Sequence, residues 1–189
     1  FYVYQQVYDA NGNPIEGAVV DRNSDGKITD ADRYFYKNPV APVTMGLSSR
    51  LEYKNWDLGF SLRASIGNYV FNGIEQGFKN VSPNGIWTLD RLGNTTPTAK
   101  LRGFVQDDAK TTLTDYWVQN ASFLKCDNIT LGYSFNNLFK TGSYKGIGGR
   151  VYATASNVFT ITKYKGLDPE VFNGYDNNMY PRAFSMILG

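Results

Sequence analysis

The stretch VTMGLSSRLEYK, residues 43–54, and the stretch WDLGFSLRASIG, residues 56–67, decide the fold class. Each alternates strictly between apolar side chains and small or polar ones, and this period of two is that of a β-strand. Asn55 lies between them, where a tight turn would join two strands. One face of the expected hairpin carries Val43, Met45, Leu47, Ser49, Leu51, Tyr53, Trp56, Leu58, Phe60, Leu62, Ala64 and Ile66.

The length of these two segments restricts the possible fold classes further. Each predicted strand has about eleven residues, whereas strands of soluble domains have about 5–6 and tilted strands that cross a bilayer have about 9–11. Tyr53 and Trp56 flank the turn, where a membrane barrel carries a girdle of aromatic residues. The periodicity fits a transmembrane barrel and a large soluble sandwich with one wetted face equally well.

The composition favours an all-β chain. Only 19% of the 189 residues are charged, while 14 Tyr, 12 Phe and 19 Gly supply residues typical of strands and turns. The 19 basic and 17 acidic residues form no concentrated basic cluster, so we expect no nucleic-acid partner. The first residues contain no Met and no charged leader before an apolar stretch, so we expect any export signal to have been removed or to lie upstream.

The residue types argue against an enzyme. Histidine is absent, which removes the commonest acid–base group, and the carboxylates show no pairing typical of glycosidases. The single cysteine, Cys126, excludes an intramolecular disulfide, and we expect a small side chain there that is buried or faces the lumen.

The rest of the chain divides by pattern. Alternation is lost over residues 68–121, which we interpret as a long loop region. Three later segments read as strands: FLKCDNITLGYSF (123–135), GRVYATASNVFTI (149–161) and RAFSMILG (182–189).

Residues 21–32, DRNSDGKITDAD, match a calcium-binding loop. Calcium takes six to eight oxygen ligands, which alternate residues of a tight loop can direct toward one centre, and Gly26 occupies the sixth position, where the chain turns sharply. The predicted ligands are the side chains of Asp21, Asn23, Asp25, Thr29 and Asp32 and the backbone carbonyl of Lys27. The alternative is an Asx-rich turn without metal. We expect a structural Ca²⁺ rather than a catalytic one, because no histidine or second carboxylate cluster lies nearby.

Several motifs occur in an order typical of one family. DRNSDGKITDADR, ASFLKCDNITLGYSF, SNVFTITKYKGLDPE and YPRAFSM follow one another along the chain. In this respect the sequence resembles the C-terminal portion of the SusC/RagA family, the TonB-dependent transporters of the Bacteroidetes outer membrane.

The resemblance implies an antiparallel transmembrane β-barrel of 22 strands, of which this chain supplies the last several. It implies that the chain is a fragment truncated at both ends, because the family's plug domain and TonB-contacting segment are absent and its usual terminal aromatic residue is missing. The implied parts are an extracellular loop with the calcium motif (9–42), a transmembrane hairpin (43–67), a long extracellular loop region (68–121) and the final strands with their connections (122–189).

The implied function is energy-dependent import of glycans or peptides. The implied partners are the rest of the barrel with its plug, outer-membrane lipid, a SusD-like surface lipoprotein and the TonB complex. No cargo-binding residue is identified from the sequence. The alternative is a soluble carbohydrate-binding β-sandwich with a dockerin-like calcium loop.

Overall fold

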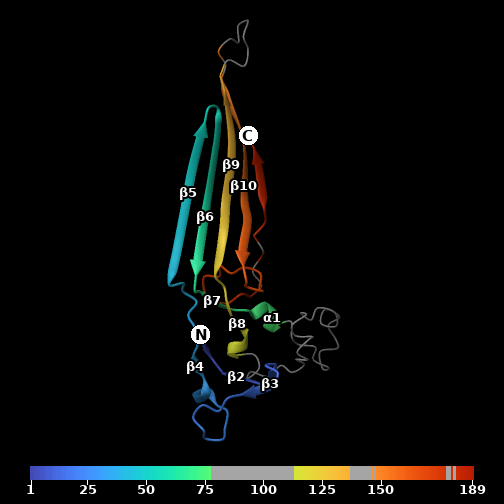
Figure 1. Ribbon diagram of the computed structural model, residues 1–189. Helices are drawn as coiled ribbons and strands as arrows, with labels where there is room; N and C mark the ends of the chain where they lie inside the picture. Colours follow the sequence, from blue (N-terminus) through green and yellow to red (C-terminus); the bar gives the residue numbers. More distant parts are fainter. Residues whose placement is uncertain (78–112, 137–145, 147, 178–179, 181) are drawn as a thin grey trace, which may run out of the picture. The chain divides into compact units, whose positions relative to one another are not determined.

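The computed structural model describes residues 1–77, 113–136, 146, 148–177, 180 and 182–189, which belong to two compact units (Figure 1). Unit 1 comprises Phe1–Ala41, Gly67–Ala121 and Tyr164–Tyr180, and unit 2 comprises Pro42–Ile66, Ser122–Lys163 and Pro181–Gly189. Across the described residues, no helix combines the length and the apolar character needed to cross a membrane.

Unit 2 is a single antiparallel sheet of five strands in the order β11-β10-β9-β6-β5 (Figure 1). Its strands are β5 (Val43–Tyr53), β6 (Trp56–Ile66), β9 (Phe123–Phe135), β10 (Gly149–Thr162) and β11 (Ser185–Leu188). Every segment predicted as a strand from residue 43 onward therefore contains a strand, although in the last segment, residues 182–189, only Ser185–Leu188 forms one. The turn between β5 and β6 has Lys54 at φ 55°, and Asn55 follows it as expected.

One face of this sheet is apolar from edge to edge. Directly opposite residues of paired strands share a face, and the register joins Leu51 to Leu58 and Leu58 to Leu131. The pairing extends this surface, here called the apolar face, over Val43, Met45, Leu47, Leu51, Leu58, Phe60, Leu62, Ile129, Leu131, Val151, Ala153, Ala155, Met186 and Leu188. Leu47 and Leu51 are each 57% exposed. The alternative β-sandwich requires a second sheet against this face, and the described part of unit 2 contains none.

The resemblance implied that this chain supplies only the last several strands of a barrel, and the described strands of unit 2 form one open sheet whose edges are β5 and β11. Five strands are too few to close around a lumen, because barrels need about eight or more. The fold is all-β with antiparallel strands, and the expected number of 22 strands stays a prediction.

The opposite surface of the sheet, here called the polar face, owes its composition partly to a β-bulge in β9. The register of β6 against β9 shifts between Ser61 and Leu62, and the register of β10 against β9 shifts between Ser156 and Phe159. Both shifts fall at Asp127. Strict alternation would place Asp127 on the same face as Ile129, but the bulge allows its carboxylate to bind the Arg63 guanidinium instead.

Unit 1 is built from short paired segments. Its elements are β1 (Tyr2–Val3), β2 (Gln6–Tyr8), β3 (Pro14–Val19), η1 (Asp30–Asp32), β4 (Tyr34–Phe35), β7 (Tyr69–Phe71), α1 (Gly73–Gly77), η4 (Asp115–Trp117) and β8 (Val118–Asn120). β1 pairs with β4, β2 with β3, and β7 with β8. The stretch 9–42, interpreted as a connection, therefore contains two strands, which turn formers such as Pro14 and Gly17 concealed in the sequence.

Two small hydrophobic clusters hold unit 1 together. Phe71, Trp117 and Val118 form one, and Val70, Ala121 and Tyr164 form the other. Both combine residues from distant parts of the chain on either side of residues 78–112. Most of the loop region predicted at 68–121 falls on those residues and lies outside the described part of the chain.

Candidate metal centre

The predicted calcium loop, residues 21–32, folds around the carboxylate of Asp21. Its Oδ1 accepts the Ser24 N–H at 2.7 Å and its Oδ2 accepts the Gly26 N–H at 2.8 Å. Gly26 has φ 77° with open space where a Cβ would lie. The sharp turn at the sixth loop position therefore uses the conformational freedom of glycine, as the sequence predicted.

The next two predicted ligands bind each other and the backbone. The Asp25 N–H donates to Asn23 Oδ1 at 3.0 Å, the Lys27 N–H donates to Asp25 Oδ1 at 2.7 Å, and Asn23 Nδ2 donates to Asp25 Oδ2 at 3.0 Å. Asn23 and Asp25 are thus held in Asx turns, and these hydrogen bonds fix the orientation of their side-chain oxygens.

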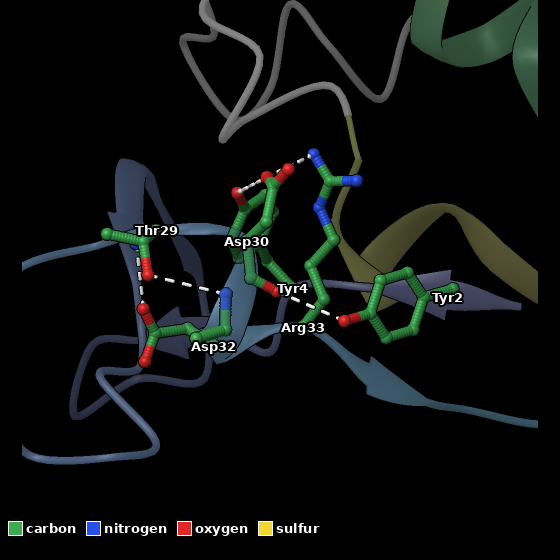
Figure 2. Close-up of polar contacts among 7 residues, drawn as sticks. Tyr2, Tyr4, Thr29, Asp30, Asp32 and Arg33 are labelled. Carbon is green, nitrogen blue, oxygen red and sulfur yellow. Dashed lines mark hydrogen bonds and ion pairs between the residues drawn. The ribbon is translucent and has the colours of Figure 1, made fainter.

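The loop closes at Thr29 and Asp32, which form a capping box at the start of the 3₁₀ helix η1 (Figure 2). The Ala31 N–H donates to Thr29 Oγ1 at 3.3 Å, and the Thr29 N–H donates to Asp32 Oδ2 at 2.8 Å. Asp32 Oδ1 also accepts the Arg22 N–H at 2.9 Å, which joins the twelfth loop position to the second. Asp32 is fully buried by this closure.

These contacts favour the ionised form of Asp32. The Thr29 N–H has the largest effect and lowers the pKa of the carboxyl group, burial opposes it, and the Arg22 and Asn23 N–H groups lower the pKa further. A hydrogen bond with the Asp21 side chain also lowers the pKa of Asp32. Two neighbouring carboxylates in one tight loop are a chemical arrangement that a cation stabilises.

The fit to calcium can be judged from the donor set. A carboxylate oxygen has two lone pairs, so the oxygens of Asp21, Asp25 and Asp32 that accept one N–H retain capacity for an ion. In the part of the chain that the structure describes, however, no three His, Cys, Asp or Glu side chains gather into a metal-binding group. The structure thus brings Asp21 and Asp32 together, while Asp25 is turned toward Asn23. The same bonds are those of an Asx-rich turn, the alternative raised by the sequence.

On the polar face of unit 2, two ion pairs join residues of different described strands, and the sequence did not reveal them. Arg63 binds both carboxylate oxygens of Asp127, with Nη2 to Oδ1 at 2.9 Å. Arg150 of β10 binds Asp57 of β6, with Nε to Oδ1 at 3.0 Å and Nη2 to Oδ2 at 2.6 Å. This second pair crosses over the intervening strand β9, and no pattern within a single strand signals such a contact.

Comparisons with known proteins agree with the resemblance seen in the sequence. No family model matches the chain. The chain is 55% identical over 190 residues to the TonB-dependent receptor SusC of Bacteroides thetaiotaomicron, an alignment that covers 100% of this chain and 19% of that receptor. It is also 28% identical over 197 residues to the TonB-dependent receptor P3 of Formosa agariphila, covering 94% of this chain and 19% of the receptor.

Solved structures with the same fold include the RagAB peptide transporter, with a TM-score of 0.70 and 24% identity, and the RagAB peptide importer in its closed-closed state, with a TM-score of 0.67 and 24% identity. Each match covers 100% of this chain and 22% of the matched chain. The chain spans about a fifth of the length of the relatives that it matches. The chain belongs to the SusC/RagA-type TonB-dependent receptors, which are β-barrel proteins of the outer membrane.

Proposed function

We propose that this chain forms part of the wall and of the extracellular surface of an outer-membrane importer. The observation that carries the proposal is the apolar face of unit 2, where strands of 11 to 14 residues present an exposed apolar surface. Such strands match the span of a bilayer, and the small or polar residues of the opposite face suit a lumen. In lipid an open strand edge leaves backbone groups unpaired, so the neighbours of β5 and β11 come from other strands of the receptor.

The connectivity of the sheet supports an assignment of its two ends. Val43 pairs with Ile66, and Phe123 pairs with Thr162. The start of β5, the end of β6, the start of β9 and the end of β10 therefore lie at the same end of the strands. The three stretches of chain that make up unit 1 all connect to the strands at this end. Since periplasmic turns of such barrels are short and extracellular connections are long, unit 1 is the extracellular part and the turn at Lys54 is periplasmic.

The proposed cargo is an oligosaccharide, imported together with a SusD-like lipoprotein and driven by TonB. Members of the resembled family import glycans or peptides, and this chain has 55% identity to SusC against 24% to the RagAB peptide transporter. An identity of 24% to the peptide transporter supports a shared fold but not a shared peptide cargo, so the proposal takes the glycan class of the family.

Uptake measurements test this proposal. A strain that lacks the intact receptor should lose uptake of fluorescent oligosaccharides, and the restored gene should recover it, whereas uptake of labelled oligopeptides should stay unchanged. A loss of peptide uptake alone would indicate that the cargo is a peptide and not an oligosaccharide. Unchanged uptake of both probes would contradict an import function.

We also propose that residues 21–32 bind a structural Ca²⁺ through Asp21, Asn23, Asp25, the Lys27 carbonyl, Thr29 and Asp32. The turns at Asp21 and Gly26, the closure by Asp32 and the interaction of two carboxylates support this site. The ion would hold a long extracellular loop rigid where little hydrophobic core lies beneath it. Extracellular calcium modules bind with a Kd of about 10⁻⁴–10⁻³ M, which is the range expected here.

Asp25→Ala is the direct test of the metal site. Calcium titration of the intact Asp25→Ala receptor should show calcium affinity reduced by roughly tenfold or more. Limited proteolysis with and without chelator should show new cleavage within residues 21–32 of this variant. Asp30→Asn is the matched control, because Asp30 lies in the same loop outside the predicted ligand set and pairs with Arg33 at 2.8 Å. Identical cleavage of the original protein with and without chelator would contradict the calcium site.

A further inference from the structure

The apolar face of unit 2 is hollowed along β10, which lies between β9 and β11 in the sheet (Figure 1). Ala153 of β10 lies directly opposite Leu131 on one side and Leu188 on the other, and directly opposite residues share a face. A small side chain is thereby flanked by two large ones. The neighbouring row of the sheet repeats this arrangement with a second alanine, Ala155.

The resulting groove has a volume of about 690 Å³ and an almost entirely apolar lining. This volume lies within the range of about 300–1,000 Å³ that is typical of small-molecule sites. Trp56 and Tyr133 line the groove beside the turn that joins β5 to β6, and their ring centres are 4.8 Å apart. Because a polar ligand would lose its hydrogen bonds in such a lining, the groove favours a hydrocarbon chain.

The aromatic end of the groove also offers two hydrogen-bond donors. Among the described residues, neither the indole N–H of Trp56 nor the hydroxyl of Tyr133 has a hydrogen-bond partner. At a membrane interface, Trp and Tyr keep their rings in the apolar region and direct these polar atoms toward the headgroups. A ligand of this groove can therefore be apolar along its length and polar at this end.

Lys54 places a positive charge beside the same end. It lies in the turn before Trp56, and its Nζ lies 5.3 Å from the centre of the Tyr53 ring. Tyr53 is directly opposite Trp56 and shares its face of the sheet, so the ammonium group lies on the apolar-face side of the turn. A lysine stem that follows apolar surface and ends in a charge is the usual arrangement at an interface.

The acidic residues around this turn already have other partners. Glu52 pairs with Arg50 at 2.9 Å, and Asp57 pairs with Arg150 at 2.6 Å. No described carboxylate forms an ion pair with Lys54. The two pairs cancel in charge, and Lys54 leaves one positive charge at this end of the described strands.

We propose that the groove along Ala153 holds one acyl chain of an anionic phospholipid, whose phosphate binds Lys54 and the indole N–H of Trp56. The inference rests on the proposed function, which places the apolar face in lipid and the turn at Lys54 on the periplasmic side. A phospholipid matches both parts of the site, because its chain suits the apolar groove and its phosphate suits the cation and the donors. Free phosphate would use only Lys54 and the donors, and a neutral lipid only the groove.

Native mass spectrometry of the intact, delipidated receptor in detergent tests the site, with phosphatidylglycerol as the probe. Ala153→Phe places a ring in the groove and should weaken binding of the tightest phosphatidylglycerol by about tenfold or more, since each buried CH₂ contributes to lipid binding. Ala64→Phe is the matched control. Ala64 lies on the same face, opposite Met45 and Leu124 and outside the groove, so this variant should bind the lipid as the original does.

Lys54→Gln tests the phosphate contact independently of the groove. It should weaken phosphatidylglycerol binding by about fivefold, the usual effect of one cation near an anionic lipid, and leave binding of neutral diacylglycerol unchanged. Lys163→Gln is its control, because Lys163 is exposed and follows the opposite end of β10. Inorganic phosphate, which has no chain, should not compete with phosphatidylglycerol at equal concentration.

The outcomes separate this site from the proposed function. Equal phosphatidylglycerol binding by Ala153→Phe and Ala64→Phe would overturn it, and so would a loss of receptor dimers in Ala153→Phe with unchanged lipid binding, which would make the groove an interface between copies. Urea midpoints in detergent show that each variant is folded, and if Ala153→Phe does not fold, an unchanged affinity of Lys54→Gln overturns the site. The import wall itself is contradicted only if the receptor stays in solution without detergent.

Discussion

A single glycine permits the ion pair between Arg150 and Asp57. Gly132 of β9 pairs with Asp57 on one side and with Tyr152 on the other. A Cβ at residue 132 would lie 2.5 Å from Asp57 Oδ1 and 2.7 Å from Arg150 Nε. The guanidinium and the carboxylate meet directly above the position where any other residue would place a side chain, so the need for glycine here is steric rather than conformational.

Gly132→Ala is therefore expected to break this pair and to lower the urea midpoint of the intact receptor folded in detergent. Gly46→Ala is the matched control, because nothing lies within 4 Å of a Cβ at that position of β5. Gly46→Ala should be neutral or stabilise by about 0.5–1 kcal/mol through the unfolded chain. Equal midpoints for the two variants would argue against a steric role of Gly132.

The ionised carboxylate of Asp32 is expected to make the closed form of residues 21–32 unstable in acid. Its folded pKa is lowered by the Thr29 N–H and its other donors, so its contribution to loop stability is fully present above the unfolded value near 3.8 and is lost as the pH falls through the folded pKa. In buffer with millimolar calcium, which keeps the loop closed at neutral pH, cleavage within 21–32 by an acid-active protease should rise as the pH falls below about 4. Asp32→Asn should be cleaved readily at every pH in this range. A pH-independent cleavage of the original loop would contradict this account.

At the scale of elements, the alternation of residues predicted all five strands of unit 2, because β5 and β6 follow a strict period of two and the later strands follow it over part of their length. The same rule failed locally in β9. Lys125 and Asp127 have the same parity as Ile129, so alternation alone places two charges on the apolar face. The bulge at Asp127 restores them to the polar face. A bulge depends on pairing with two neighbours at once, which a single strand does not encode.

The two faces of β6 should respond differently to charge. Leu62 lies on the apolar face opposite Leu47, in the middle of the strand, and Leu62→Arg should destabilise the folded receptor in lipid by about 2–4 kcal/mol. Ser61→Arg is the neighbouring control on the polar face. It should cost about 1 kcal/mol or less, since it removes the 3.0 Å hydroxyl contact with Ser48. Urea titration of vesicle-folded receptor measures both values, and similar losses would contradict the proposed lipid-facing surface.

At the scale of the whole molecule, sequence and structure differ in what they reveal. The absence of histidine and of convergent acid–base groups predicted a non-enzymatic chain, and SusC/RagA-type receptors are transporters rather than enzymes. The calcium motif was recognisable because its predicted ligands lie within twelve residues, and the site itself stays a prediction. The contact between Tyr34 and Asp115 was not recognisable, because it joins residues 81 positions apart. Local spacing thus predicts sites within a loop but not the contacts that connect the loop to other segments.

The two compact units should also lose their structure separately, and Cys126 provides the reporter for unit 2. This only cysteine of the chain is 1% exposed and lies opposite Leu62 and Phe159 in the sheet. If calcium supports unit 1 alone, a chelator should open residues 21–32 to protease while Cys126 remains unreactive toward maleimide, as read by mass spectrometry of its peptide. Urea should expose Cys126 only at concentrations that unfold the sheet. Labelling of Cys126 on chelation without urea would show that the loop and the sheet unfold together, against the division of the chain into two units.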